Sequence, residues 1–311
     1  MSISSVLNRF QKLQLGKRNA LKSSPNENIR QLWEDTNLNN VNLDSLLMVN
    51  TGVRAQKLLS LSQSEKASQH FINLLYQRKS VRSVVENISS KIIKNWANMN
   101  ELLPGFIFNF VKKALQSQLP TRANLKRWGK AASEFCPLCH QVQSNKHVLS
   151  NCSNPVVLKR YTERHDKILT LLSNWLVSKI DNKVCKVFCD LPEFDQISDL
   201  FSSLRPDLAL MKGQNIKIIE LTVCHETNLS NSRTYKIDKY KDIQKHTTEL
   251  TKNFTISVTT CEVSTLGFLQ FYSNYLKDFN IPHFDEAFVN KLSTCAIQSS
   301  FDIYAHLDSI V

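Results

Sequence analysis

Glycine is scarce in this chain of 311 residues. Only six glycines occur, and no two of them lie closer than 24 positions. The phosphate-binding loops of kinases, P-loop NTPases and Rossmann dehydrogenases need clustered glycines, because backbone N–H groups must come close to the phosphates. The sequence therefore excludes these three classes of nucleotide-binding enzyme.

Long apolar runs and dense cysteines are also missing. No stretch reaches the ~18 consecutive apolar residues that a transmembrane helix needs, so we expect no membrane partner. Eight cysteines are too few for a disulfide scaffold in a chain of this length. No signal peptide is recognisable at the start, so we expect the cysteines to be reduced.

Basic residues are abundant and unevenly placed. The formal charge is +12, which makes a polyanion the first partner to consider, with a merely solvated basic surface as the alternative. Residues 111–167 hold 11 Lys and Arg against three acids, so most of the excess is concentrated there. The first 26 residues carry five basic residues and no acid. They form either a transit peptide or, as we favour, a basic helix.

The chain is about twice the ~150-residue prior for one domain, so more than one unit is expected. Residues 1–100 have the pattern of helices with polar breaks and carry no recognisable chemistry. Residues 101–155 form a basic segment with a cysteine cluster, and residues 156–311 form an α/β unit. Apolar periodicity predicts a mixed α/β fold with helices at 102–115, 156–180, 229–250, 265–279 and 284–306, and strands at 184–191, 208–211, 216–223 and 254–263.

Three cysteines and one histidine have the spacing of a zinc site. They are Cys136, Cys139, His147 and Cys152, within 17 residues. Zinc favours four such ligands in a tetrahedron, and a closed set of four leaves no open position, so this zinc would be structural. His140 is a competing ligand, but the spacing of His147 fits better. Cys185 and Cys189 have no matching second half, and we expect them to pack within a strand.

A second constellation joins two acids and two lysines. Asp207 precedes a predicted strand, and Glu220 lies in the apolar strand that follows, with twelve residues between them. Across a hairpin the two carboxylates can meet, and oxygen ligands with open positions suit Mg²⁺. Lys236 and Lys239 follow on one face of the next predicted helix. The alternative is an ordinary salt-bridged hairpin beside a solvated helix.

The same residues resemble a nuclease motif. Pro206-Asp207 followed by Glu220 is similar to the PD-(D/E)xK motif, and the predicted order αβββαβ is the core of that superfamily. Thr222 stands where the motif has its lysine. A lysine displaced to the next helix is a feature of the restriction-like endonuclease of site-specific non-LTR retrotransposons, the kind that insert into ribosomal RNA genes. Residues 119–125, the cysteine cluster, 164–166 and 236–240 also resemble this family, so that the similarity covers residues 101–311.

The resemblance implies a carboxy-terminal part of a retrotransposon reverse transcriptase polyprotein. No Asp-Asp pair occurs, so the polymerase is expected to be absent, and residues 1–100 are only weakly similar to its helical thumb and linker. The resemblance implies a nuclear, Mg²⁺-dependent endonuclease that nicks target DNA, whose freed 3′ hydroxyl primes reverse transcription. Asp207 and Glu220 would hold Mg²⁺ with the Leu221 carbonyl. Lys236 is the first choice for the catalytic lysine and Lys239 the second.

Nucleic-acid contacts are predicted at seven positions: Arg122, Lys126, Arg127, Lys130, Arg164, His165 and Arg205. The partner is target DNA, with RNA of the element left open and no prediction of oligomeric state. Trp128, within the basic segment, would either stack on an unpaired base or be a buried anchor. Two rival interpretations remain: a catalytically inactive nucleic-acid-binding protein derived from a retrotransposon, and a helical adaptor based on residues 1–100.

Overall fold

The computed structural model describes residues 78–270 and 273–310. The predictions made for residues 1–77 lie outside this range. The described residues belong to one compact unit. The boundaries predicted near residues 100 and 155 fall within this unit.

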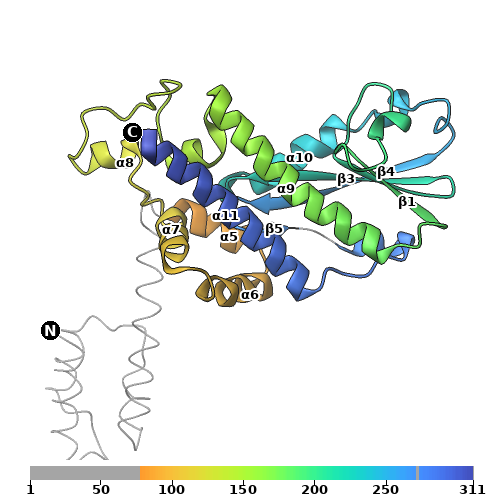
Figure 1. The fold of residues 1–311 in the computed structure, drawn as a ribbon, viewed down its shortest axis with the longest axis horizontal. Helices are drawn as coiled ribbons and strands as arrows, with labels where there is room; N and C mark the ends of the chain where they lie inside the picture. The colour runs from red at the N-terminus through yellow and green to blue at the C-terminus, as the bar shows by residue number, and fades with distance from the viewer. Residues whose placement is uncertain (1–77, 271–272, 311) are drawn as a thin grey trace, which may run out of the picture. The chain divides into compact units, whose positions relative to one another are not determined.

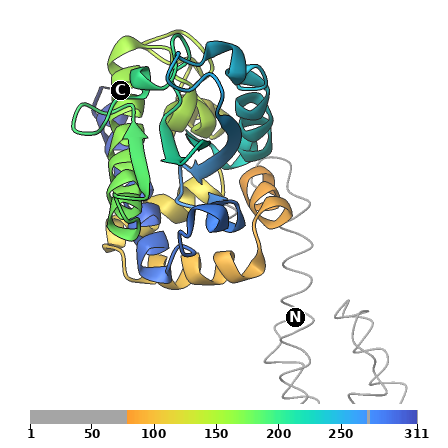
Figure 2. The same ribbon diagram turned by 90° about the vertical axis from the view of Figure 1, so that its right-hand side faces the viewer.

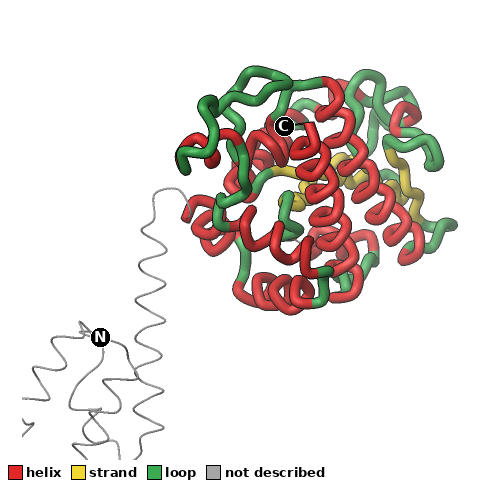
Figure 3. The backbone as a smooth tube through the Cα atoms, turned by 60° about the vertical axis from the view of Figure 1, so that its left-hand side comes forward, coloured by secondary structure: helices red, strands yellow, loops and turns green. Residues whose placement is uncertain are grey.

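A five-stranded sheet is the centre of the fold. Its strands are β1 Cys185–Cys189, β2 Leu208–Lys212, β3 Asn215–Cys224, β4 Thr255–Ser264 and β5 Leu269–Gln270, in the spatial order β1-β2-β3-β4-β5. Only the β3–β4 pair is parallel. Gly213 adopts φ 57° in the turn that joins β2 to β3, a conformation that favours glycine. Figure 3 shows the strands enclosed by helices.

Helices cover both faces of this sheet. On one face lie α9 (Pro155–Lys179) and α11 (Glu286–Ile310), which pack against alternate residues of the strands, such as Leu210, Ile219 and Leu221. The other face is covered by α10 (Leu229–Lys239) and the 3₁₀ turn Ile243–His246. Figures 1 and 2 show the sheet between α9 and α10. The order α9-β1-β2-β3-α10-β4 confirms the predicted αβββαβ arrangement and the mixed α/β class.

Two predicted helices differ from the structure over most or a large part of their length. The helix expected over 229–250 ends at Lys239, and the 3₁₀ turn Ile243–His246 follows it. Further along, Thr251 lies in a loop and donates a hydrogen bond to the Leu200 carbonyl, 2.7 Å away. The helix expected over 265–279 does not form; β5 and the 3₁₀ segment Ser273–Phe279 replace it. Gly267, at φ 80°, turns the chain back after β4.

A second core joins the amino-terminal helices to the rest of the unit. These helices are α5 (Arg78–Asn87), α6 (Ser90–Glu101), α7 (Gly105–Leu115) and α8 (Arg122–Arg127). Helix α7 begins three residues later than predicted, directly after Pro104. Trp96 donates to the Leu266 carbonyl at 2.6 Å and stacks on Phe268. None of the helices in the described residues is long and apolar enough to cross a membrane.

Candidate functional site

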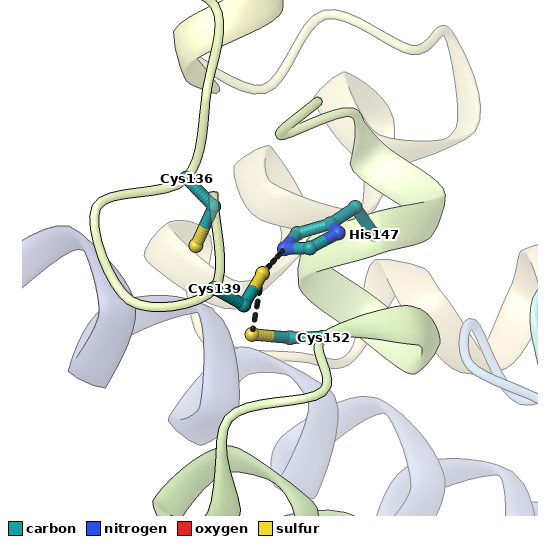
Figure 4. A group of neighbouring side chains, drawn as sticks. All are labelled: Cys136, Cys139, His147 and Cys152. Atoms are coloured by element: carbon teal, nitrogen blue, oxygen red, sulfur yellow. Dashed lines mark hydrogen bonds between the residues drawn. The ribbon is translucent and has the colours of Figure 1, made fainter. Parts of the chain in front are cut away.

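The four predicted zinc ligands converge at one point (Figure 4). The ligand atoms of Cys136, Cys139, His147 and Cys152 all lie within 4.8 Å of one another. Cys139 Sγ is 3.4 Å from His147 Nε2 and 3.8 Å from Cys152 Sγ. A tetrahedron with Zn–S bonds of ~2.3 Å has S···S edges of about 3.8 Å, so this geometry fits a bound Zn²⁺.

Local backbone structure holds the ligands in place. We call residues 133–154 the zinc segment. The Cys136 N–H donates to the Gln141 carbonyl at 2.7 Å, and the His140 N–H donates back to Cys136 at 2.9 Å, which closes the turn between the paired cysteines. Tyr161 of α9 receives the Cys152 N–H at 3.2 Å and donates to the Val148 carbonyl at 2.8 Å. Helix α9 therefore anchors the part of the zinc segment that carries His147 and Cys152.

Burial decides the protonation of these ligands before metal binds. Cys136 and Cys152 are each 1% exposed. Burial raises the pKa of Cys152 to about 12 and lowers the pKa of His147 below its usual value. The imidazole is therefore neutral and ready to coordinate, whereas metal binding must displace thiol protons. His140 is exposed and outside the cluster, and Cys185 and Cys189 are buried in strand β1, as expected.

The two predicted acids also meet. Asp207 precedes β2, and the pairing of Leu208 with Ile219 sets it opposite Glu220 of β3. The Asp207 N–H donates to Glu220 Oε1 at 3.0 Å, and the Leu221 N–H donates to Asp207 Oδ2 at 2.8 Å. Glu220 is fully buried, whereas the side chain of Asp207 is 16% exposed. The Glu220 carboxylate is therefore held in the protein interior, whereas the Asp207 carboxylate reaches solvent.

Lys236 of α10 bridges both carboxylates. Its ammonium donates to Glu220 Oε2 and lies 3.6 Å from Asp207 Oδ2. Burial alone would lower the pKa of Lys236, but the two negative charges outweigh it and raise the pKa. Burial and the Asp207 charge raise the pKa of Glu220 despite the lysine. Burial opposes ionisation of Asp207 too, yet His165 and Lys236 outweigh it and lower its pKa.

Lys239 points elsewhere. Its ammonium donates to the Tyr240 hydroxyl at 2.9 Å, and that hydroxyl donates to the Arg205 carbonyl at 3.2 Å. Tyr240 is buried against the sheet face that α10 covers. The structure therefore brings together Asp207, Glu220 and Lys236, and it gives Lys239 a supporting contact with Tyr240.

Of the other predicted nucleic-acid contacts, His165 and Arg205 lie near the carboxylate cluster, whereas Arg164 is buried elsewhere. His165 of α9 lies with Nε2 3.5 Å from Asp207 Oδ1 and Nδ1 3.1 Å from Asp166, so it borders the carboxylate cluster. Arg205 is exposed nearby. Arg164 is 2% exposed and donates to the Leu149 carbonyl and to Ser300 Oγ, each at 2.9 Å. The predicted contact of Arg164 with nucleic acid is therefore wrong: this side chain ties the zinc segment to α11.

The basic segment lies on and after α8. Thr121 caps this helix by accepting the Asn124 N–H at 3.4 Å. Lys126, Arg127 and Lys130 are exposed, Arg122 is partly buried, and Lys126 lies 3.3 Å from Glu134. Trp128 is 42% exposed, so the alternative of a buried anchor is wrong for this residue.

One buried acid was missed from the sequence. Glu262 of β4 is fully buried and pairs with Thr222, so it shares a sheet face with Glu220. Neither carboxylate oxygen has a hydrogen-bond partner in the described part of the chain, and burial raises the pKa of Glu262. An acid inside an apolar strand was the signal that identified Glu220, and the same signal was available in Cys261-Glu262-Val263.

Comparison with known families supports the zinc site. Residues 65–156 match the family model described as zinc-binding in reverse transcriptase, and this range contains all four ligands. The zinc-binding region is thus similar to that of retrotransposon-related reverse transcriptases. No curated protein matches the chain.

Proposed function

We propose that this protein is a Mg²⁺-dependent DNA endonuclease of retrotransposon origin that nicks target DNA in the nucleus. The observation that carries the proposal is the meeting of Asp207, Glu220 and Lys236, which come from the residue before β2, from β3 and from α10 of an αβββαβ fold. The match of the neighbouring zinc segment to a reverse-transcriptase family supports the retrotransposon origin.

The carboxylates are suited to hold Mg²⁺. Mg²⁺ in phosphate-processing sites is bound by one or two carboxylates and keeps several waters, and Asp207 and Glu220 supply that donor set at a partly exposed position. Bound there, Mg²⁺ would polarise a phosphodiester oxygen and neutralise part of its charge.

The chain's own residues would position the substrate and stabilise charge. The Asp207 N–H and the Leu221 N–H fix the orientation of the two carboxylates. The Lys236 ammonium would stabilise the negative charge that develops on the phosphorane-like transition state, because a preorganised cation in a partly buried site acts strongly. His165 is 3.5 Å from Asp207 Oδ1 and would orient this carboxylate.

The zinc segment and the basic residues of α8 would bind the substrate. Zinc in a closed Cys₃His site is structural, so its role is to hold residues 133–154 against α9 and α7. Arg122, Lys126, Arg127 and Lys130 would neutralise phosphates of the target.

A second candidate function is nucleic-acid binding without cleavage. The zinc-binding match supports this candidate. That match covers residues 65–156, so it includes the zinc ligands but does not reach Asp207 or Glu220. In that case the sheet would be an inactive scaffold, and the protein would bind nucleic acid through the zinc segment and α8.

Incubation of the purified chain with supercoiled DNA and Mg²⁺ tests the proposal. We expect conversion to open circles by the wild type and none by Asp207→Asn. Asp302→Asn, which removes an exposed carboxylate on α11, is the matched control and retains activity. Binding without any nicking by the wild type would favour the second candidate function.

A further inference from the structure

A large cleft lies away from the carboxylate cluster. Its volume is about 1060 Å³, and its walls come from α5, α8, the zinc segment and the chain just beyond β3. Neither Asp207 nor Glu220 lines it. His225, which lines it, follows Glu220 by five residues on the same strand and its exit, so the backbones of these two residues lie roughly 16 Å apart at ~3.3 Å per residue.

Side-chain hydrogen bonds fix the walls of the cleft. Helix α5 is held to the sheet domain because Ser83 Oγ donates to the Glu226 carbonyl at 2.8 Å and Ser230 Oγ donates to Asn87 at 2.6 Å. On the opposite side, Asn124 donates to the Leu119 carbonyl at 2.6 Å from α8. The cleft is therefore a built feature of the fold, bounded by elements that are tied to its core.

The rim of the cleft is basic. Five cations and two acids line it: Lys79, Arg82, Lys126, Arg127 and Lys146, with Glu86 and Glu134. The two acids form exposed ion pairs, Arg82–Glu86 and Lys126–Glu134. Exposed pairs of this kind contribute little, so a phosphate can replace the acid. Lys79 and Lys146 have no ion-pair partner within the described residues. The rim is thus suited to a polyanion.

The floor of the cleft holds buried polar groups that lack partners. Ser80, Asn145 and His225 are 0%, 6% and 4% exposed and all line the cleft. Ser80 Oγ and Asn145 Oδ1 make no hydrogen bond within the part of the chain that the structure describes, whereas His225 Nε2 lies 3.5 Å from Oε2 of the buried Glu226. Because buried polar groups are nearly always paired, the hydroxyl of Ser80 and the amide oxygen of Asn145 indicate a ligand with its own donors and acceptors.

We propose that this cleft binds a single-stranded segment of nucleic acid, with phosphates at the basic rim and the edge of an unpaired base at the polar floor. In a duplex the base edges are paired and enclosed between two backbones, whereas a single strand can turn its bases into a cleft and offer their edges. Trp128, adjacent to Arg127 and 42% exposed, offers an aromatic surface for stacking. The inference goes beyond nuclease activity and does not depend on it.

Binding measurements without added divalent metal separate this inference from the proposed function. Fluorescence anisotropy would measure the affinity for labelled single-stranded DNA, single-stranded RNA and duplex DNA. A length of about ten nucleotides is suitable, because single-strand binding sites cover ~4–16 nucleotides. We expect tighter binding of a single strand, DNA or RNA, than of the duplex. Tighter binding of the duplex overturns the inference, whether or not the protein nicks DNA.

Two lysines test the rim. The double variant Lys79→Ala/Lys146→Ala removes two phosphate contacts, so the slope of log affinity against log salt for a single strand becomes shallower by about 1.4, at ~0.7 per contact. The matched control is Lys183→Ala/Lys186→Ala, which removes two exposed charges at β1, and it leaves the slope unchanged. Equal slopes for the two double variants would overturn the assignment of the rim.

An abasic oligonucleotide tests the floor. If the floor contacts a base edge, the wild type binds the normal strand more tightly than a strand abasic throughout, and Asn145→Ala reduces that difference. Zinc content and melting temperature show whether Asn145→Ala remains folded. If it does not, the wild-type comparison still decides: equal affinity for the normal and abasic strands contradicts recognition of bases.

Discussion

Replacing Lys236 by alanine separates the catalytic proposal from an ordinary salt bridge. The change removes an ammonium that contacts Glu220 and lies 3.6 Å from Asp207 Oδ2. It leaves a fully buried carboxylate facing a second acid. The nearby Lys239 contacts Tyr240 instead, so Lys239→Ala is a matched control on the same helix.

The structure allows the loss of stability and the loss of nicking rate in Lys236→Ala to be estimated. At 3.6 Å the attraction between unit charges is roughly 5 kcal/mol at an effective dielectric constant of ~20, before desolvation is subtracted. The side chain of Lys236 is 21% exposed, and Glu220, whose pKa is already raised, can take up a proton. We therefore expect a net loss of about 2 kcal/mol, which lowers the melting temperature by ~4–8 °C. Losing one preorganised stabilising group lowers the nicking rate by a further ~10²–10³-fold.

Single-turnover nicking of supercoiled DNA in Mg²⁺, with melting temperature measured on the same samples, gives both numbers. We expect Lys236→Ala to lose nicking while it remains folded at the assay temperature, and Lys239→Ala to cleave at a rate close to that of the wild type. If Lys236→Ala cleaves normally and Lys239→Ala fails, the assignment of the displaced lysine is wrong. A loss of stability in Lys236→Ala without any loss of rate would identify an ordinary salt bridge.

Three other perturbations have defined outcomes. Removing zinc with a chelator, or by Cys139→Ser, is expected to increase amide hydrogen exchange in the zinc segment, α7 and the end of α11, because these elements share a core. Strands β1–β4 should stay protected, and an equal increase of exchange across the whole unit would contradict the separation of the two cores. Gly267→Ala, at φ 80°, brings a Cβ within 2.7 Å of the Ser293 carbonyl oxygen and lowers the free energy of unfolding by at least about 2 kcal/mol. Gly129→Ala, at φ 70° with open space around it, costs only the ~1–2 kcal/mol of backbone strain. Equal melting temperatures for the two variants would refute this. Thr222→Val removes a buried hydroxyl that has no hydrogen-bond partner among the described residues, so nicking is unchanged and thermal stability is equal or higher; loss of nicking would give Thr222 the role assigned to Lys236.

Local patterns were sufficient to predict the sheet and both residue clusters. The predicted strands differ from β1–β4 by at most two residues at either end, because apolar runs between turn signals are local features. The zinc ligands followed from spacing alone, since four ligands within one short segment need little help from the rest of the fold. Asp207 and Glu220 meet because a tight hairpin at Gly213 fixes the register of β2 and β3.

Features that depend on distant contacts were not predictable. The charge of Arg164 suggested a phosphate contact, but its partners are the Leu149 carbonyl and Ser300, the latter 136 residues away in sequence. The chain bends at Gly267 because α11 approaches it, and Ser293 Oγ donates to the Gly267 carbonyl at 2.7 Å. Helical periodicity contains no information about such neighbours, so the helix predicted over 265–279 was wrong.

The chemistry of the cut ends tests the central claim most directly. The wild-type chain is incubated with supercoiled DNA and Mg²⁺, and a DNA polymerase with labelled nucleotides is then added to the open circles. We predict label incorporation at the nicks, which shows free 3′ hydroxyl ends, and no open circles with Asp207→Asn or Glu220→Gln. Equal amounts of open circles from the wild type and both variants, or nicks that the polymerase does not extend, would contradict an endonuclease centred on Asp207, Glu220 and Lys236.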